Sequence, residues 1–285
     1  MNTILLTIAA LAPAIVLAVY IYKKDSAEKE PAGLLLKLLI CGIIIAWPVV
    51  QVESIFDSTI YHIFLPVAEE QGGTIVLFGF WYYLYQWVKN TIGIALVEEG
   101  FKFLALYLVT SKNKNFNSLF DGVIYSVFVS LGFAGFENIL YCFQYGWGTA
   151  ISRMVTAVPA HTFFGILMGF CYTIWHVLEK AKEREIQFAE AGMIKRNNEY
   201  FSGKGMLVLA LVIPTLIHGF YDFCCSIGEA WANILFYLLM IGLYKFCFSN
   251  VRKLSRADQS DMRVVDGMLI GKYPELLEKN KDEEV

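Results

Sequence analysis

Charged residues are scarce in this sequence: they form 17% of the 285 residues, against about a quarter in a typical soluble domain. Hydrophobic residues form 57% and aromatic residues 15%, which excludes a water-soluble globule. Basic residues are not in excess either, because the formal net charge is −3. A basic surface for nucleic acid is therefore excluded, and the composition is typical of a protein that lies in a membrane.

Several common functional motifs are also absent. The sequence has no His-Glu-x-x-His zinc motif, no Gly-rich phosphate loop and no recognisable serine nucleophile motif. The six cysteines lie within or at the edges of apolar runs and none is spaced as Cys-x-x-Cys, which argues against a disulfide scaffold. We interpret them as buried thiols: Cys41, Cys142, Cys171, Cys224, Cys225 and Cys247.

Runs of about 20 apolar residues recur along the chain, and this length crosses roughly 30 Å of hydrocarbon. The first run has no basic residue before it and two lysines directly after it, the reverse of a cleavable signal peptide. The pattern predicts an all-α, polytopic transmembrane helical bundle with seven spans, near residues 3–22, 34–52, 91–110, 119–144, 154–178, 205–224 and 230–247.

The stretch 75–88 decides between seven and eight spans. It is apolar but short, and its aromatic density favours an interfacial or re-entrant helix. If it does not cross, every basic loop lies in the cytoplasm, as the positive-inside rule asks; if it crosses, all later loops change sides. We favour seven spans with the N-terminus outside, and eight spans is the alternative. The bundle then covers 1–247 with a cytoplasmic loop at 179–204, and 248–285 is a cytoplasmic tail.

Charged and histidine side chains lie inside these spans, where each charge costs roughly 2.5–3.5 kcal/mol at a helix centre. One lysine cannot neutralise four carboxylates, so the others must bind protons, meet a cation or line a water-filled cavity. The residues concerned are Glu98, Glu99, Lys102, Glu137, His161, His218 and Asp222.

Spacing places several of these groups at a common depth, roughly 9–11 Å below the outer surface at 1.5 Å rise per residue. The groups in this layer are Glu98, Glu137, His161 and His218. Asp222 lies one turn after His218, so its carboxylate can orient the imidazole or join it in binding a cation. Glu98 and Glu99 are about 100° apart around their helix and must face different partners.

Four motifs in a fixed order carry a resemblance to a known family. They resemble the PrsW family of intramembrane proteases over most of residues 1–247. A fainter similarity extends to the CAAX prenyl protease and bacterial Abi group, whose second motif ends in histidine where this chain has Glu137. The motifs are Glu98-Glu99-x-x-Lys102, Phe133-x-x-x-Glu137 followed by Asn138, His161 with Gly169-Phe170, and His218-Gly219-x-x-Asp222-Phe223.

The resemblance implies a multi-pass endopeptidase of the bacterial cell membrane. Such an enzyme makes the first extracytoplasmic cut in a single-span, membrane-bound anti-sigma factor, starting a cascade that frees a sigma factor. Its partners would be that substrate and the membrane lipid. The glutamate pair of the family maps onto Glu98 and Glu99 and its histidines onto His161 and His218; Glu137 joins the predicted catalytic set, with Lys102, Asn138 and Asp222 in support.

The first hypothesis is peptide hydrolysis by an activated water, with Glu98 or Glu99 as general base. His161 and His218 then either bind a metal, for which Zn²⁺ is suited, or polarise the scissile carbonyl without one. The alternative is a proton- or cation-coupled transporter, against which stands the lack of a repeated half. The candidate metal ligands are Glu98, Glu99, Glu137, His161, His218 and Asp222.

Overall fold

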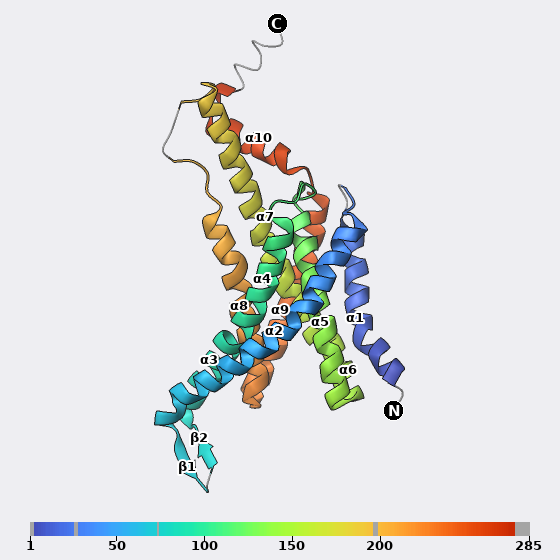
Figure 1. Ribbon diagram of the computed structural model, residues 1–285, viewed down its shortest axis with the longest axis vertical. Helices are drawn as coiled ribbons and strands as arrows, with labels where there is room; N and C mark the ends of the chain where they lie inside the picture. Colours follow the sequence, from blue (N-terminus) through green and yellow to red (C-terminus); the bar gives the residue numbers. More distant parts are fainter. Residues whose placement is uncertain (1–2, 26–27, 73, 196–198, 277–285) are drawn as a thin grey trace.

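The computed structural model describes residues 3–25, 28–72, 74–195 and 199–276, and almost all of its elements are helical (Figure 1). The predicted all-α fold is confirmed, with one small hairpin that was not predicted. Residues 277–285 of the predicted tail lie outside the described part. The elements are α1 (Thr3–Lys24), α2 (Ala32–Phe64), the 3₁₀ helix η1 (Leu65–Val67), β1 (Glu69–Gln71), β2 (Thr74–Val76), α3 (Gly79–Val88), the π-helix η2 (Lys89–Ala95), α4 (Leu96–Thr110), α5 (Asp121–Tyr145), α6 (Trp147–Val155), α7 (Ala157–Glu190), α8 (Lys204–Ile227), α9 (Ala230–Arg256) and α10 (Asp261–Lys272).

Six helices in the described residues are long and apolar enough to cross a membrane: those built on α1, α2, α5, α7, α8 and α9. The predicted span 91–110 is not among them. Helix α4 has only 15 residues, and its first turn carries Glu98 and Glu99 with Lys102 one turn further on. Helix α4 is shorter than the helices of that set, and its charged residues need protein rather than lipid around them.

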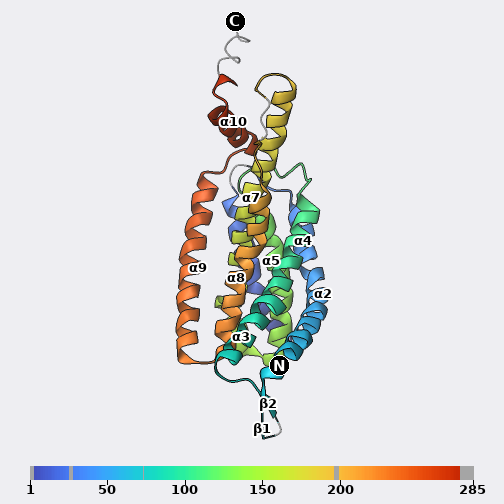
Figure 2. The same ribbon diagram turned by 90° about the vertical axis from the view of Figure 1, so that its left-hand side faces the viewer.

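The helices run alternately up and down, so each end of the bundle collects distinct elements. The start of α1, the β1–β2 hairpin and α6 lie at one end, and α10 lies at the other (Figure 1). Helix α5 is central and packs against α1, α2 and α7. In its apolar window 78% of residues are buried, against 22% for α9, which stands at the edge of the bundle (Figure 2).

Two helices continue well beyond their predicted apolar spans. Helix α2 reaches Phe64 and α7 reaches Glu190, because polar turns can extend a helix once it has left the hydrocarbon. Part of the predicted loop 179–204 is thus helical, and α10 packs against it. Glu185 of α7 accepts a 2.7 Å hydrogen bond from Lys272 of α10, which ties the two helices together.

The predicted helix within 75–88 begins at Gly79 and does not end before the next span. Helix α3, η2 and α4 follow one another without a turn, from Gly79 to Thr110. The intervening π-helix is a rare geometry that inserts extra residues into a helical turn and is frequent at functional sites. It shifts the residues of α4 around the helix axis relative to α3, directly before the two glutamates.

Glycines allow the central helices to approach closely. A Cβ atom built on Gly169 of α7 would overlap the backbone of Gly122 in α5, and one on Gly132 of α5 would overlap the backbone of Leu39 in α2. Gly169, which is part of one of the four sequence motifs, therefore serves helix packing.

The Gly169→Ala variant should lower the stability of the bundle by about 1–3 kcal/mol, because the added methyl forces α7 away from α5. The matched control is Gly242→Ala in α9, where an added Cβ meets no atom within 4 Å. Thermal unfolding in detergent micelles measures both. Equal melting temperatures for the two variants would contradict the close-packing explanation.

Candidate active site

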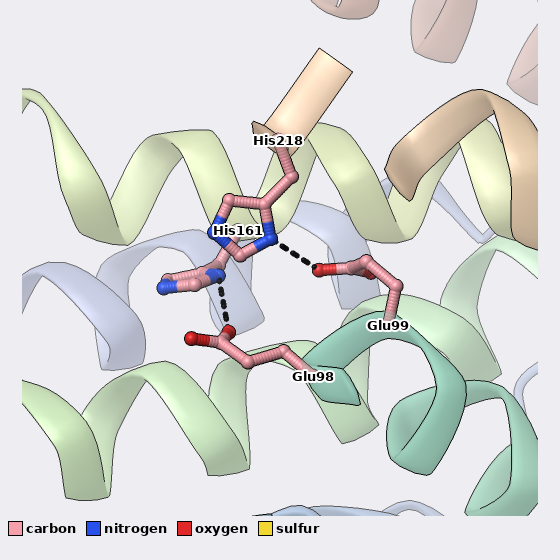
Figure 3. Close-up of side chains that lie close together, drawn as sticks. All are labelled: Glu98, Glu99, His161 and His218. Atoms are coloured by element: carbon pink, nitrogen blue, oxygen red, sulfur yellow. Dashed lines mark hydrogen bonds and ion pairs between the residues drawn. The ribbon is translucent and has the colours of Figure 1, made fainter. Parts of the chain in front are cut away.

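Four buried side chains from three helices converge in the interior. Glu98 and Glu99 come from α4, His161 from α7 and His218 from α8 (Figure 3). One nitrogen or oxygen atom from each lies within 4.8 Å of the others, and none of the four side chains is more than 7% exposed. The structure thus brings together the glutamate pair and both histidines that sequence reasoning singled out.

The orientation of His218 depends on how α8 packs. The next residue, Gly219, lies against η2, where an added Cβ would come within 2.7 Å of the Thr91 Cα atom. The imidazole of His218 stacks on the ring of Phe164 with centroids 4.6 Å apart. It also meets the ring of His161 edge-on at 5.2 Å. Close backbone approach on one side and ring stacking on the other hold this histidine against α4 and α7.

Lys102 supplies the positive charge at the centre of the site. Its ammonium donates to Glu98 Oε2 at 2.9 Å and to Glu99 Oε1 at 2.8 Å, four and three residues before it on the same helix. The same ammonium lies 3.1 Å from His161 Nδ1 and 4.2 Å from the centroid of the Phe133 ring. The side chain is 1% exposed, so these contacts replace all of its hydration.

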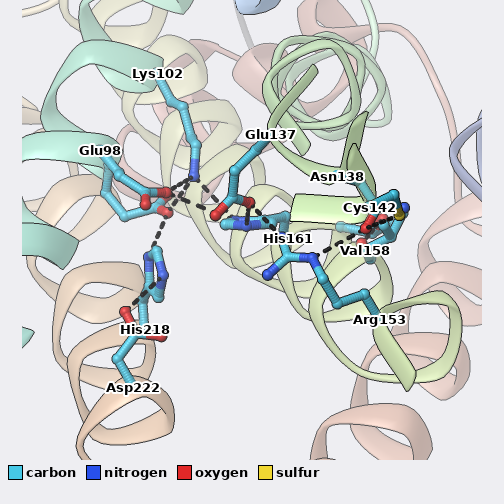
Figure 4. Close-up of polar contacts among 12 residues, drawn as sticks. Glu98, Lys102, Glu137, Asn138, Cys142, Arg153, Val158, His161, His218 and Asp222 are labelled. Atoms are coloured by element: carbon cyan, nitrogen blue, oxygen red, sulfur yellow. Dashed lines mark hydrogen bonds and ion pairs between the residues drawn. The ribbon is translucent and has the colours of Figure 1, made fainter. Parts of the chain in front are cut away.

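Each histidine has a carboxylate behind it. His161 Nε2 lies 2.9 Å from Glu137 Oε2, and His218 Nε2 lies 3.2 Å from Asp222 Oδ2 (Figure 4). In both rings Nδ1 faces the centre, and His218 Nδ1 lies 3.0 Å from Glu99 Oε1. Glu137 and Asp222, which were also candidate ligands from sequence, thus contact the outer nitrogens of the two rings.

The donor atoms suit a divalent metal such as zinc. Two imidazoles with carboxylates are zinc donors, and a carboxylate behind each imidazole is the usual support for a metal-binding histidine. Glu99 Oε2 is buried and has no hydrogen-bond partner in the described residues. In the hydrogen-bonded cluster four carboxylates meet two permanent cations, Lys102 and Arg153, and two histidines. With both histidines neutral, two negative charges are left for a divalent ion to neutralise. A bound ion would take over contacts that Lys102 makes.

A cavity of about 650 Å³ gives access to this cluster. Glu98, His161 and His218 line it, whereas Glu99 does not. Its outer wall is formed by residues at the junction of α5 and α6 and by the first turns of α9. The cavity is large enough for several residues of an extended peptide, and it leads from the α6 end of the bundle to the Glu98 carboxylate.

Arg153 of α6 was not among the site residues inferred from sequence. Its Nη2 donates to Glu137 Oε2 at 2.7 Å and its Nε donates to Asn138 Oδ1 at 2.9 Å. Asn138, expected in a supporting position, is fully buried and donates to the Ala10 carbonyl of α1 at 2.8 Å. One feature of the sequence could have drawn attention to Arg153. It is the single lysine or arginine in the three segments predicted to lie outside, 53–74, 145–153 and 225–229.

Comparison with known proteins identifies the family. Residues 30–247 match the family described as "PrsW family intramembrane metalloprotease". The chain is 28% identical to "Protease PrsW" of Bacillus subtilis (strain 168) over 90% of this chain and 97% of that protein. It is 30% identical to "Protease PrsW" of Clostridioides difficile (strain 630) over 93% of this chain and 96% of that protein. No solved structure gives a significant match. With most of its length matched and a buried glutamate and histidine cluster able to bind a metal, the chain belongs to the PrsW family of intramembrane metalloproteases.

Proposed function

We propose that this chain cleaves a single-span membrane protein on the extracytoplasmic side of the bacterial cell membrane. The substrate is an anti-sigma factor, whose first cut leads to release of a sigma factor. The observation that carries the proposal is the cavity that exposes Glu98, His161 and His218 toward the end of the bundle formed by α6 and the β1–β2 hairpin. A segment just outside a substrate span would meet the protein at that end.

The proposed topology has seven spans, which are the six long apolar helices and α4. Helix α4 buries its charged face and exposes Leu104 and Leu108, as a helix between protein and lipid should. The unbroken helix through α3, η2 and α4 leaves no turn at which 75–88 could end a separate crossing. The N-terminus and the hairpin then lie outside, and α10 lies in the cytoplasm.

In the proposed mechanism Glu98 is the general base. Its carboxylate faces the cavity, where it can take a proton from a water molecule and later give it to the leaving amine. Glu99, His161 and His218 would hold the metal ion, which matches the three protein ligands of many catalytic zinc sites. A bound metal ion supplies Lewis-acid chemistry at the scissile carbonyl.

The groups around these four residues keep them in place. Glu137 and Asp222 contact the outer nitrogens of the imidazoles, so that each Nδ1 is directed inward. The Nδ1 of His218 donates to Glu99 Oε1 at 3.0 Å and would bind a metal only after losing that proton. Lys102 neutralises part of the charge of the glutamate pair, which reduces the repulsion between the two carboxylates. Burial excludes water from all sides except the cavity.

Cysteine labelling in intact cells tests the topology. Single cysteines replace the exposed Glu70 in the hairpin or Glu190 at the end of α7. The chain used has Cys225 changed to serine, because this thiol is exposed and the interpretation of all six cysteines as buried was wrong for it. An impermeant thiol reagent should label position 70 in intact cells and position 190 only after permeabilisation. Labelling of position 190 from outside would contradict seven spans and favour eight.

Glu→Gln substitutions test the mechanism with purified protein and candidate single-span substrates in liposomes. Glu98→Gln should reduce cleavage by about 10²–10⁴-fold with an unchanged melting temperature, because the amide cannot accept a proton. Glu99→Gln should lower both cleavage and stability, since it weakens the contacts to Lys102 and His218. Glu69→Gln in the exposed hairpin is the matched control. Near-normal cleavage by both site variants would rule out the glutamate mechanism.

Measuring the zinc content of variants distinguishes the proposed metal ligands from the residues that support them. We expect about one zinc ion per purified chain, lost in His161→Ala and His218→Ala and retained in His62→Ala, whose histidine is exposed. Asp222→Asn should keep the ion with about 10- to 100-fold lower affinity, because Asp222 contacts only the outer nitrogen of His218. Full cleavage activity in exhaustively chelated, metal-free protein would contradict the metal-dependent scheme.

A further inference from the structure

Arg153 reaches the site from outside the set of residues that carry the proposed chemistry. It lies in the last turn of α6, a helix of nine residues that ends before α7 begins. Its side chain lines the main cavity and is 15% exposed. The opposite side of α6 presents Ile151, which is 64% exposed. The arginine therefore connects this peripheral helix with the polar interior.

A single carboxylate oxygen links Arg153 to a site histidine. Glu137 Oε2 accepts hydrogen bonds from Arg153 Nη2 at 2.7 Å and from His161 Nε2 at 2.9 Å. With its Nε2 proton directed to Glu137, the His161 ring has its Nδ1 lone pair toward Lys102 and Glu98. The direction of the ring thus depends on where Glu137 is held.

Other contacts immobilise the guanidinium itself. Arg153 Nε donates to Asn138 Oδ1, and Asn138 in turn donates to the backbone of α1. The guanidinium carbon lies 4.0 Å from the centroid of the Tyr141 ring, within cation–π range. A planar guanidinium with two engaged nitrogens and a ring beneath it has one orientation, which a lysine ammonium could not reproduce.

We propose that Arg153 is a positioning residue, which sets the direction and tautomer of the His161 ring through Glu137. This inference rests on the proposed function, because it assigns Arg153 to the same site. Without the guanidinium the Glu137 carboxylate loses its cationic partner in a largely desolvated position and turns toward the water of the cavity. The His161 Nε2 proton then loses its fixed acceptor, and Nδ1 no longer points steadily at the glutamates.

Nitrogen NMR of histidine side chains tests this proposal independently of catalysis. The purified full-length chain, labelled at its four histidines, is compared as wild type, Arg153→Met, Arg153→Lys and Ile151→Ala, all in the same metal state. Signals of His161 are assigned by their loss in His161→Gln. The wild type should show one His161 form with the proton on Nε2. Arg153→Met should shift or split that signal, Arg153→Lys should do so less, and Ile151→Ala should leave it unchanged.

Kinetics on the same variants give the second readout. Arg153→Met should lower kcat by about 10- to 100-fold, the usual cost of losing support behind a site histidine, while KM stays within about twofold. Melting temperatures are measured beside that of Ile151→Ala, so that kcat is compared only at temperatures where every variant is folded. Adding Arg153→Met to Glu137→Gln should cause no further loss of kcat, because both act through one carboxylate.

Three results would overturn the positioning role. They are an unchanged His161 signal in Arg153→Met, a loss confined to KM, and full additivity with Glu137→Gln. If wild-type protein cuts none of the candidate substrates, the proposed function fails, yet the NMR comparison still decides the role of Arg153.

Discussion

The buried contact of Lys102 with Glu98 and Glu99 is the interaction on which the rest of the structure depends. Two carboxylates and one ammonium leave water together, and removing the ammonium of Lys102 would strand two negative charges in a medium of low dielectric constant. Helix α4 can carry these groups only if other helices enclose their face. Its packing against α2, α5 and α8 meets that need, and its apolar face remains for lipid.

Charge also explains the arrangement around this centre. The histidines of α7 and α8 approach the glutamate pair with one nitrogen, and the carboxylates of Glu137 and Asp222 hold the other nitrogen. Every added carboxylate deepens the negative potential, and Arg153 offsets only one of them. A site built in this way attracts a divalent cation, which agrees with membership of a metalloprotease family.

Much of this could be predicted from sequence, because burying charge in apolar helices is costly and therefore conspicuous. The depth of Glu98, His161 and His218 follows from helical rise alone, and the helices do bring them together. Arg153 could not be placed, since its distance to Glu137 depends on how α6 folds back over α5. The predicted second span ends at residue 52, which would place Glu53 just outside the membrane. Helix α2 continues, and it buries Glu53 Oε1 beside a second cavity of about 340 Å³.

X-ray absorption at the zinc edge of the purified, active protein tests most directly whether the buried cluster holds the metal. Binding at Glu99, His161 and His218 requires nitrogen and oxygen neighbours at about 2.0–2.2 Å, with the multiple-scattering pattern of two imidazoles. A sulfur neighbour at about 2.3 Å would place the ion at a cysteine instead. A shell of oxygen alone would mean that neither histidine binds the ion, and either result would contradict the assignment of the metal to this cluster.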